Sequence, residues 1–487
     1  MQALPLLALE GLGLIVLGYI VNQTVFRQQR QLPLPPGPKP WPIIGNLLDV
    51  PKVRPWEGYA EWGRKYGNIF SLRVLGQVIV VVNSPTIARD LLEKRGSMYS
   101  SRPSIAFVEL ADSEWALPFS HYGSRWRSGR RILEGSLRQG VISQYWPIQR
   151  ARAYDFIAST LHAPGDFRLH ITYAVAAISL EVVYGYKCTD PGDGFVLLSE
   201  KATKIMTESL LPGAMIVNTF PFLRHFPRWL PGMGFHKLAA ESKYLNDRLR
   251  DVPYDHMKET LLSLQGSNAL RPSMVSEILN ATRDKGVSAE DEQAMKEAAG
   301  SVYGASVETA RLRTRLDSDR RTDAHKAQAE IEAVIGTERL PDFGDRPKLP
   351  YVEALCMELS RWRLAAPLGV VHSTTEDDVY NGFFIPKGST VWANAWAMLH
   401  DPVVYPDPES FTPERFLTPD GLVKEDPLWS SVFGFGRRKC PGRHLADATI
   451  WIFVTSVLAT LIVRPPKDHQ GLDIPLDDVG LTTGLVR

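Results

Sequence analysis

One ten-residue stretch decides the interpretation of this chain: Phe433-Gly434-Phe435-Gly436-Arg437-Arg438-Lys439-Cys440-Pro441-Gly442. It sets a single cysteine in a loop of glycines and cations, just before a helical pattern over about residues 443–461. Metals bind the thiolate form of cysteine, and nearby positive charge lowers the pKa of a thiol. A helix after Cys440 would direct the positive end of its dipole toward the sulfur, and Gly436 and Gly442 would let a bulky planar group approach the backbone. The stretch therefore predicts that Cys440 ligates haem iron.

A buried structural cysteine beside a basic turn is the alternative interpretation of this loop. The spacing favours haem, because it resembles, position for position, the signature of the cytochrome P-450 family of haem-thiolate monooxygenases. The matching residues are Phe433, Gly436, Arg438, Cys440 and Gly442. The resemblance covers about residues 32–487 apart from 311–325. It implies the cytochrome P-450 fold, mainly α-helical with a smaller β-sheet lobe and an N-terminal transmembrane anchor, and is greatest for fungal microsomal members.

The overall composition is that of a globular protein. Apolar residues make up 44% and charged residues 22% of the chain, which excludes a disordered chain. Lysine and arginine number 55 against 54 aspartate and glutamate, so a nucleic-acid partner is not expected. The three cysteines, Cys188, Cys356 and Cys440, show no paired spacing. A reducing compartment is therefore expected rather than a disulfide framework.

The N-terminal residues Ala3 to Val21 have the length of a membrane-spanning helix. Eleven of them are Leu, Ile or Val, and one, Glu10, is charged. On the insertion scale the apolar residues contribute roughly −3 to −7 kcal/mol against about +3 for the acid. A soluble helix and a cleaved signal peptide are the alternatives, and the latter lacks a charge before the apolar run. Because Arg27, Arg30 and Lys39 follow the run, we expect a single-pass protein of the endoplasmic reticulum membrane with a cytoplasmic catalytic domain.

Six prolines between Pro33 and Pro42 mark the boundary between the expected anchor and the globular part. Proline-rich segments are stiff and extended, so we expect a rigid hinge rather than a docking motif for a partner domain. The expected organisation is an N-terminal membrane anchor over residues 1–24, a basic, proline-rich hinge over 25–45, and a haem-thiolate catalytic domain over 46–487.

The residue pattern predicts the main elements of the catalytic domain. Residues 70–74 and 78–82 read as two strands, and a helix is expected from the Ser84-Pro85 pair to about Lys94. Residues 150–295 are mostly helical in pattern. Within them, prolines interrupt an apolar and aromatic segment, Leu210 to Phe235. That segment could contact membrane or substrate, or pack in the core.

A helical stretch that opens at Trp126 carries the next candidate residues. Trp126 and Arg130 are four residues apart and share one face of a helix. Such a pair could hydrogen-bond a haem propionate, although Trp and Arg on one helix face usually pack and solvate. The family resemblance implies the propionate role. Arg127 and Arg131 would instead face a redox partner.

The segment Gly304 to Thr309 resembles the family's long helix over the haem, which carries the pattern small-Gly-x-acid-Thr. Glu308 and Thr309 match the acid and the hydroxyl residue, which implies that they relay protons. Ser306 departs from the pattern, because glycine is usual there and makes room for dioxygen. A serine would crowd that space, or kink the helix by hydrogen-bonding back to a carbonyl.

A second departure is the run of charges over residues 311–325, where the family helix is apolar. Burial of so many unpaired charges would be prohibitive. Either the helix ends early and the segment is a solvated loop, or the translated gene model is wrong over about 310–325. We favour the second hypothesis. An mRNA that encodes these charges unchanged would contradict it.

Three charged residues downstream complete the candidate site. Glu358 and Arg361 have the i,i+3 spacing of an ion pair on one helix face, and Arg415 lies in a later loop. The resemblance implies that these three form a buried structural triad, in which paired charges satisfy each other. It also implies a propionate contact for His372, although Val371 precedes it where proline is usual.

The resemblance implies the chemistry as well. The cofactor would be haem b, and its thiolate ligand favours O–O cleavage. No flavin or dinucleotide motif is present in the sequence, so the electrons would come from NADPH through a membrane-bound NADPH–cytochrome reductase or a cytochrome b-type donor. The substrate would be an apolar small molecule, such as a terpenoid, that is hydroxylated or epoxidised.

Two functions from other classes remain open at this point. One is a haem-thiolate isomerase or dehydratase that uses no dioxygen, which the presence of Glu308 and Thr309 disfavours. The other is a catalytically impaired homologue, because of the atypical segment over 306–325. The substrate pocket would be built from apolar-rich stretches. These are residues 101–120, 205–235, 298–309, 366–371 and 481–484.

Overall fold

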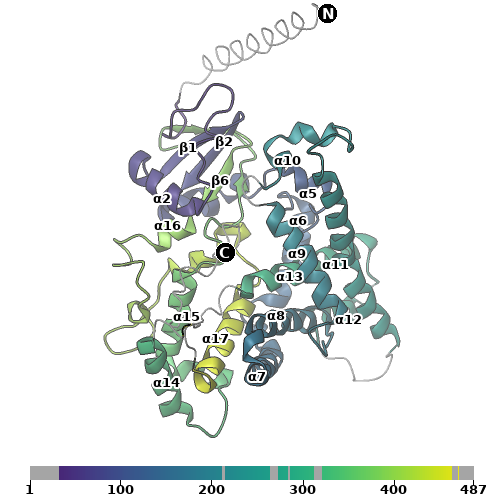
Figure 1. Ribbon diagram of the computed structural model, residues 1–487, viewed down its shortest axis with the longest axis vertical. Coiled ribbons are helices and arrows are strands. Elements are labelled where there is room, and N and C mark those ends of the chain that lie inside the picture. The colour runs from purple at the N-terminus through teal and green to yellow at the C-terminus, as the bar shows by residue number, and fades with distance from the viewer. Residues whose placement is uncertain are drawn as a thin grey trace, which may run out of the picture.

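The structure is a computed structural model that describes residues 32–210, 214–263, 272–282, 286–311, 321–462 and 470 (Figure 1). The side chains of residues 307–311 and 321 are outside the description. Several expectations therefore lie outside the described residues. They are the anchor over 1–24, the charges over 312–320, and the closing turn at 481–484.

A four-stranded sheet forms the smaller lobe, at one end of the molecule (Figure 1). Its strands, in spatial order, are β1 (Ile69–Val74), β2 (Gln77–Val82), β6 (Thr390–Ala393) and β3 (His372–Ser373), and a separate pair is β4 (Asp378–Tyr380) with β5 (Phe383–Ile385). Among the described strands, β2 pairs with β6 in parallel, and the other pairs are antiparallel. Alternate residues of β1 and β2 enter different apolar clusters, with Phe70 and Leu72 in one and Val80 and Val82 in the other. The two predicted strands are confirmed.

The predicted helix from Ser84-Pro85 is also confirmed, with one irregularity. The Ser84 hydroxyl accepts a hydrogen bond from the Ile87 amide at the N-cap, and α3 (Pro85–Arg89) follows. The chain then continues as a π-helical turn, η1 (Asp90–Lys94). Since π turns occur often at functional sites, the neighbours of η1 matter below.

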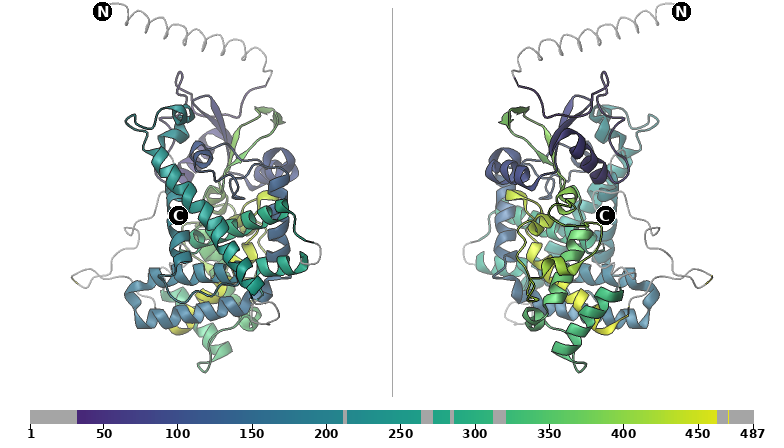
Figure 2. Two further views of the ribbon diagram at one scale, coloured as in Figure 1. Left: turned by 90° about the vertical axis from the view of Figure 1, so that its right-hand side faces the viewer. Right: turned by 90° about the vertical axis from the view of Figure 1, so that its left-hand side faces the viewer.

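The larger lobe is helical, as Figure 2 shows from two further sides. Its longer helices are α6 (Ser124–Leu137), α7 (Trp146–His162), α8 (Phe167–Tyr184), α9 (Gly194–Ser209), α11 (Phe235–Ser263), α12 (Met274–Thr282), α13 (Ala289–Arg311), α14 (Arg321–Ile335), α15 (Pro350–Trp362) and α17 (Arg443–Thr460). Shorter ones are α2 (Pro55–Tyr66), α4 (Gly96–Tyr99), α5 (Ala106–Leu110), α10 (Ile216–Thr219), η4 (Pro221–His225) and α16 (Ala395–Leu399). The predicted helical character of residues 150–295 is confirmed.

Helix α8 lies in the core of this lobe and packs against α7 and α13. Within the described ranges, Pro164–Tyr184 is the one helical stretch long and apolar enough to span a membrane, and 72% of its apolar window is buried inside the protein. A helix that is apolar on all sides belongs in a core or a membrane. The packing of α8 assigns it to the core.

Helix α17 positions the cysteine stretch. It starts at Arg443 and ends at Thr460, within one residue of the predicted bounds. Its side chains from Trp451 to Leu458 are all buried, in a cluster shared with α7, α14 and α15. The Cys440 loop is thus attached to a helix whose later turns are buried in the core. The architecture is mainly α-helical with a small sheet lobe, as expected.

Candidate functional site

The Cys440 loop is closed by hydrogen bonds across its base. The Cys440 amide donates to the Phe433 carbonyl at 2.8 Å, and the Lys439 amide donates to the Gly436 carbonyl at 3.1 Å. Gly434, at φ +81°, makes the turn that this closure requires. The Cys440 carbonyl accepts from Arg443 Nη1 at 3.1 Å, at the first residue of α17. The sulfur therefore lies beside the positive end of a long helix.

The two signature glycines have different neighbours. A Cβ atom on Gly442 would lie 4.0 Å from Cys440 Sγ, so this glycine keeps the space beside the sulfur open. A Cβ atom on Gly436, at φ +55°, would lie 2.0 Å from the Leu92 carbonyl oxygen. Gly436 therefore lets the loop pack on the π-helical turn η1, and its role beside a planar group stays a prediction. The Phe433 ring packs edge-on against Trp429, with 5.8 Å between ring centroids.

Next to this loop lies a cluster of basic side chains that we call the cation cradle: the buried Arg102 and His372 and the partly buried Arg438. Arg438 donates to the carbonyls of Ser100, Leu117 and Ser120 at 2.7–3.0 Å. Arg102 donates to the carbonyls of Pro118, Val370 and Val371 at 2.6–2.8 Å. Carbonyl partners satisfy the donors of a guanidinium but leave its charge uncompensated.

His372 lies within the same cluster. It opens β3, is 7% exposed, and its Nδ1 lies 2.8 Å from the Tyr99 carbonyl. Burial, and next the charge of Arg102, lower its pKa to about 3. Burial and then Arg130 lower the pKa of Arg438 to about 9, and burial and Arg438 lower the pKa of Arg102. Arg102 and Arg438 therefore each disfavour the charged form of a neighbour in the cluster.

The cation cradle carries no carboxylate among the described residues, since every hydrogen bond of the three goes to a backbone carbonyl. Buried charges are normally paired or hold a ligand. An anionic group of two carboxylates would supply the missing charge, and the nearby cysteine sulfur is a metal ligand. These residues fit a haem, whose propionates would meet the cation cradle and whose iron would meet Cys440.

Trp126 and Arg130 lie on α6 as predicted, but they make different contacts. Trp126 is buried, and the Arg438 guanidinium lies 4.5 Å from the centre of its indole ring. Arg130 donates to Glu134 at 2.8 Å and to the Lys439 carbonyl at 2.5 Å. Trp126 thus supports the cation cradle through Arg438, while Arg130 joins α6 to the cysteine loop.

A pocket of about 710 Å³ opens between α6 and the cysteine loop. Its lining includes six arginines: Arg127, Arg130, Arg131, Arg138, Arg437 and Arg443. Glu134 is the acid among its lining residues. A concave surface with this charge attracts an acidic partner.

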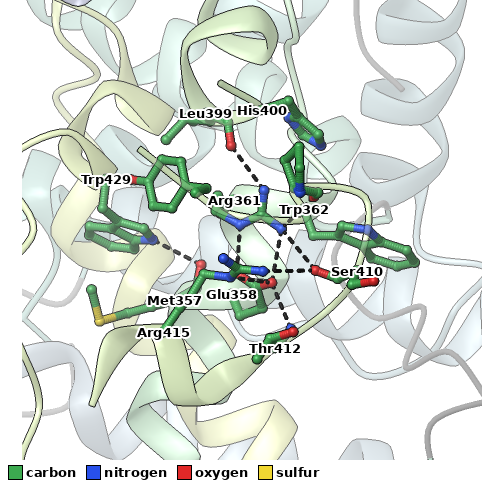
Figure 3. A network of polar contacts seen from close by, with 12 residues as sticks. Met357, Glu358, Arg361, Trp362, Leu399, His400, Ser410, Thr412, Arg415 and Trp429 are labelled. Atoms are coloured by element: carbon green, nitrogen blue, oxygen red, sulfur yellow. Dashed lines mark hydrogen bonds and ion pairs between the residues drawn. The ribbon is translucent and has the colours of Figure 1, made fainter. Parts of the chain in front are cut away.

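The three residues predicted as a triad are in contact (Figure 3). Arg361 donates two hydrogen bonds to Glu358, at 2.6 and 2.9 Å, and Arg415 Nε donates to Glu358 at 3.2 Å. The side chains of Glu358 and Arg361 are fully buried. The amide of Thr412 completes the shell of the carboxylate at 2.8 Å, and the carbonyl of Leu399 accepts from Arg361 at 2.9 Å. This network ties α15 to the loop before the cysteine stretch.

The predicted distal residues lie on α13. Glu308 and Thr309 are within the helix, and their side chains are outside the described part of the chain. The Ser306 hydroxyl lies 2.9 Å from the Tyr303 carbonyl and 2.5 Å from the Ser179 hydroxyl on α8. Of the two predicted consequences of serine here, the back-bonded arrangement is present. The crowding prediction is corrected, because the hydroxyl is turned toward α8.

Of the charged segment, only its two ends are described. Helix α13 ends at Arg311 and α14 begins at Arg321. Two residues of α14 contact other elements. Asp323 accepts a hydrogen bond from the Tyr351 hydroxyl of α15 at 3.3 Å, and Lys326 contacts Glu414 at 2.5 Å. These contacts join α14 to α15 and the Arg415 loop. The hypothesis that the translated gene model is wrong over about 310–325 stays a prediction.

Sequence reasoning missed Arg102. It stands between Ser101 and Pro103 in a loop with no acid nearby in the sequence. Its carbonyl partners come from two distant segments, near residues 118 and 370. An arginine in an acid-free, serine-rich loop was the available signal, and it is weak, since such residues are mostly exposed.

The comparisons with known proteins agree with this geometry. The family model for cytochrome P-450 matches residues 35–485. Cytochrome P-450 monooxygenase COX1 of Coprinopsis cinerea is 36% identical, over 96% of this chain and 92% of its own length. Monooxygenase 105 of Postia placenta is 38% identical, over 96% and 89%. Monooxygenase claR of Ampulloclitocybe clavipes is 37% identical, over 95% and 86%. With a match that spans almost the whole chain, the protein belongs to the cytochrome P-450 family of oxidoreductases.

Proposed function

We propose that the protein is a membrane-anchored haem-thiolate monooxygenase, which inserts one oxygen atom of O₂ into an apolar small molecule by hydroxylation or epoxidation. The observation that carries the proposal is the pairing of the Cys440 loop with the cation cradle, whose positive charge lacks a carboxylate among the described residues. Cys440 would be the axial ligand of haem b, and Arg102, His372 and Arg438 would bind its propionates. When bound, the haem supplies oxygen activation, favoured by a thiolate ligand.

The other predicted residues would have two roles, proton transfer and structural support. Glu308 and Thr309 would carry protons toward the distal side, as general acids within reach of a reacting oxygen. Glu358, Arg361 and Arg415 would keep the cysteine side rigid. Expression with a reductase, NADPH and a panel of apolar compounds, read by mass spectrometry, tests the function. Incorporation of one ¹⁸O atom from labelled dioxygen is expected, and product without label would contradict the proposal.

Electrons would enter through the arginine-lined pocket beside α6. Its arginines favour an acidic docking surface, such as that of an NADPH–cytochrome reductase or a cytochrome b-type donor. Arg131→Glu should slow reductase-driven reduction, and the effect should shrink at high salt. Arg248→Glu on α11 reverses a charge elsewhere and is the matched control. Equal rates for both variants would argue against this surface.

Membrane attachment is proposed from two features. Ala3 to Val21 has the length and apolarity of a spanning helix. In addition, Phe222, Trp229 and Trp41 are exposed, Trp229 by 80%. The sheet lobe and α10, which precedes Phe222, lie toward the same end of the molecule (Figure 1). Aromatic side chains are favoured at membrane interfaces. The endoplasmic reticulum is the expected membrane, with the catalytic domain on the cytoplasmic side.

A truncation separates the two features. Deletion of residues 1–24 should leave weak binding to lipid vesicles, and Trp229→Ser in the truncated protein should abolish it. Vesicle flotation measures both. No binding by the truncated protein would limit the membrane contact to the N-terminal segment.

The substrate is proposed to be apolar because of the cluster between α5 and α11. Phe107, Met206, Val217, Met233 and Phe235 are its larger buried members. The cluster is part of the packed core, and most of its members come from two of the stretches predicted to build the pocket, 101–120 and 205–235. A pocket built beside it would bind an apolar ligand. A fungal secondary metabolite such as a terpenoid has this character, and the similar proteins are fungal monooxygenases.

Two other functions are distinguished by simple measurements. An isomerase or dehydratase would form product anaerobically without NADPH. A catalytically impaired homologue would consume NADPH without oxygenated product, or fail to bind haem.

A further inference from the structure

Ser306, which stands where the family usually has glycine, contacts a serine of the neighbouring helix. The inference drawn from this contact goes beyond the proposed function and rests on it. Ser306 and Ser179 approach to 2.5 Å between α13 and α8. Each hydroxyl also lies near a backbone carbonyl of its own helix: Tyr303 at 2.9 Å for Ser306, and Val175 at 3.0 Å for Ser179. Ser179 is only 1% exposed. The two hydroxyls therefore form a partly buried bridge between neighbouring helices.

The direction of Ser306 follows from helix geometry. The Ser301 hydroxyl accepts from the Leu117 amide at 3.0 Å, and the Leu117 carbonyl accepts from Arg438. The Ser301 face of α13 is therefore the face toward the cation cradle. At 3.6 residues per turn, Ser306 lies about 140° around the helix from Ser301 and about 60° from position 309. Its hydroxyl is directed toward α8, as the contact with Ser179 shows.

The back-bond gives Ser306 an effect on the helix. A serine hydroxyl that donates to the carbonyl three residues earlier competes with the main-chain amide and bends the helix. The carbonyl concerned belongs to Tyr303, whose regular partner is the amide of residue 307. The competition therefore falls directly before Glu308 and Thr309, in a helix that is continuous to Arg311.

The pair has fewer protons than contacts. Two hydroxyl hydrogens serve three close approaches: one between the hydroxyls and one to each carbonyl. When one hydroxyl donates to the other, one carbonyl lacks its side-chain donor, and which carbonyl it is depends on how the two hydroxyls are oriented. Loss of either serine removes the contact between the two hydroxyls, and with it the alternative orientations.

We propose that Ser306 and Ser179 are a positioning pair, which sets the bend of α13 directly before Glu308 and Thr309 and so limits the loss of reducing equivalents as peroxide. Neither serine is a catalytic residue in this proposal. Ser179 holds α8 against Ser306, and Ser306 acts on the backbone of α13.

The test compares Ser306→Ala, Ser179→Ala, the double variant and the conservative Ser306→Thr in the haem-loaded full-length protein. Ser276→Ala is the control, because Ser273 and Ser276 form a similar buried pair at 3.0 Å on and before α12. Two quantities are measured: the infrared stretching band of carbon monoxide bound to the reduced protein, and peroxide released per NADPH with the reductase present.

The expected result is a shifted carbon monoxide band in both single alanine variants and a rise in peroxide of about fivefold, the effect of one typical hydrogen bond. The double variant should resemble the single ones, because all remove one contact. Ser306→Thr should restore the wild-type values, and Ser276→Ala should keep them.

An intact thiolate spectrum with an unmoved carbon monoxide band in Ser306→Ala and Ser179→Ala would overturn the inference alone. Additive effects in the double variant would also overturn it. A wild-type protein without the thiolate spectrum would overturn the proposed function and this inference with it.

Discussion

Two clusters of buried charge near the cysteine stretch differ in one respect. In the triad of Glu358, Arg361 and Arg415, the carboxylate pairs with both guanidiniums. In the cation cradle, Arg102, His372 and Arg438 have carbonyl partners alone within the described residues. A paired cluster is complete within the chain, whereas an uncompensated one is stabilised by an anion from outside. The difference separates a structural role from a binding role among residues of similar burial.

The largest expected effect is a loss of stability when the triad is disrupted. Arg361→Met leaves the fully buried Glu358 without its main partner, which should lower the free energy of unfolding by about 3–5 kcal/mol. Chemical denaturation followed by circular dichroism measures this loss. Arg346→Met, in the pair with Glu353 on α15, is the control for a partly exposed pair. An Arg361→Met protein as stable as wild type would remove the structural assignment of the triad.

The second prediction concerns the cation cradle and tests whether Arg438 binds haem rather than stabilising the fold. Arg438→Met should weaken haem retention by roughly 10- to 100-fold, the value of a hydrogen bond to a charged group. Its far-ultraviolet circular dichroism should stay native, because the variant removes a charge that the fold alone does not pair. Transfer of haem to an excess of a haem-free acceptor protein measures retention. Wild-type retention together with lost folding would place Arg438 with the triad instead.

The smallest expected effect concerns pH. In the haem-free protein the pKa of His372 is about 3, below its ordinary 6.5, because of burial first and Arg102 next. The unfolded chain takes up a proton as pH falls below 6.5, whereas the folded chain does not. The contribution to stability is thus present above pH 6.5 and is lost as pH falls toward 3, at about 1.4 kcal/mol per unit.

Between pH 7 and pH 5 this loss should reach about 2 kcal/mol, and His372→Gln should remove it. Urea denaturation at both pH values measures the difference. Bound propionates would favour the charged imidazole, so the haem-loaded protein should lose less stability over the same range. Equal pH dependence for wild type and His372→Gln would contradict the assigned environment of His372.

Much of the fold was predictable because local patterns determine it. The Ser84 cap and Pro85 mark a helix start, and α17 is an apolar run that follows a glycine-rich loop. The π-helical turn η1 was not predictable, since its contact is the distant Gly436. The same reason applies to Arg102, whose partners lie near residues 118 and 370.

The candidate site divides in the same way. The family resemblance of a local loop predicted the roles of Cys440 and Arg438, and the i,i+3 spacing predicted the contact of Glu358 with Arg361, which the structure shows. The direction of Ser306 depends on which face of α13 meets α8, and sequence spacing does not give that choice. Tertiary packing therefore determines the contact of Gly436 with η1 and the direction of Ser306.

The central claim is that the Cys440 thiolate binds the haem that the cation cradle orients. The most direct test is the absorption spectrum of the reduced, carbon monoxide-bound protein, recorded for wild type and Cys440→Ala. The account predicts the red-shifted Soret band of a haem-thiolate protein in the wild type. It predicts no such band in Cys440→Ala, and no loss of the band in Cys356→Ala, whose thiol is buried and has its pKa raised by that burial. A thiolate band that survives Cys440→Ala would contradict the account.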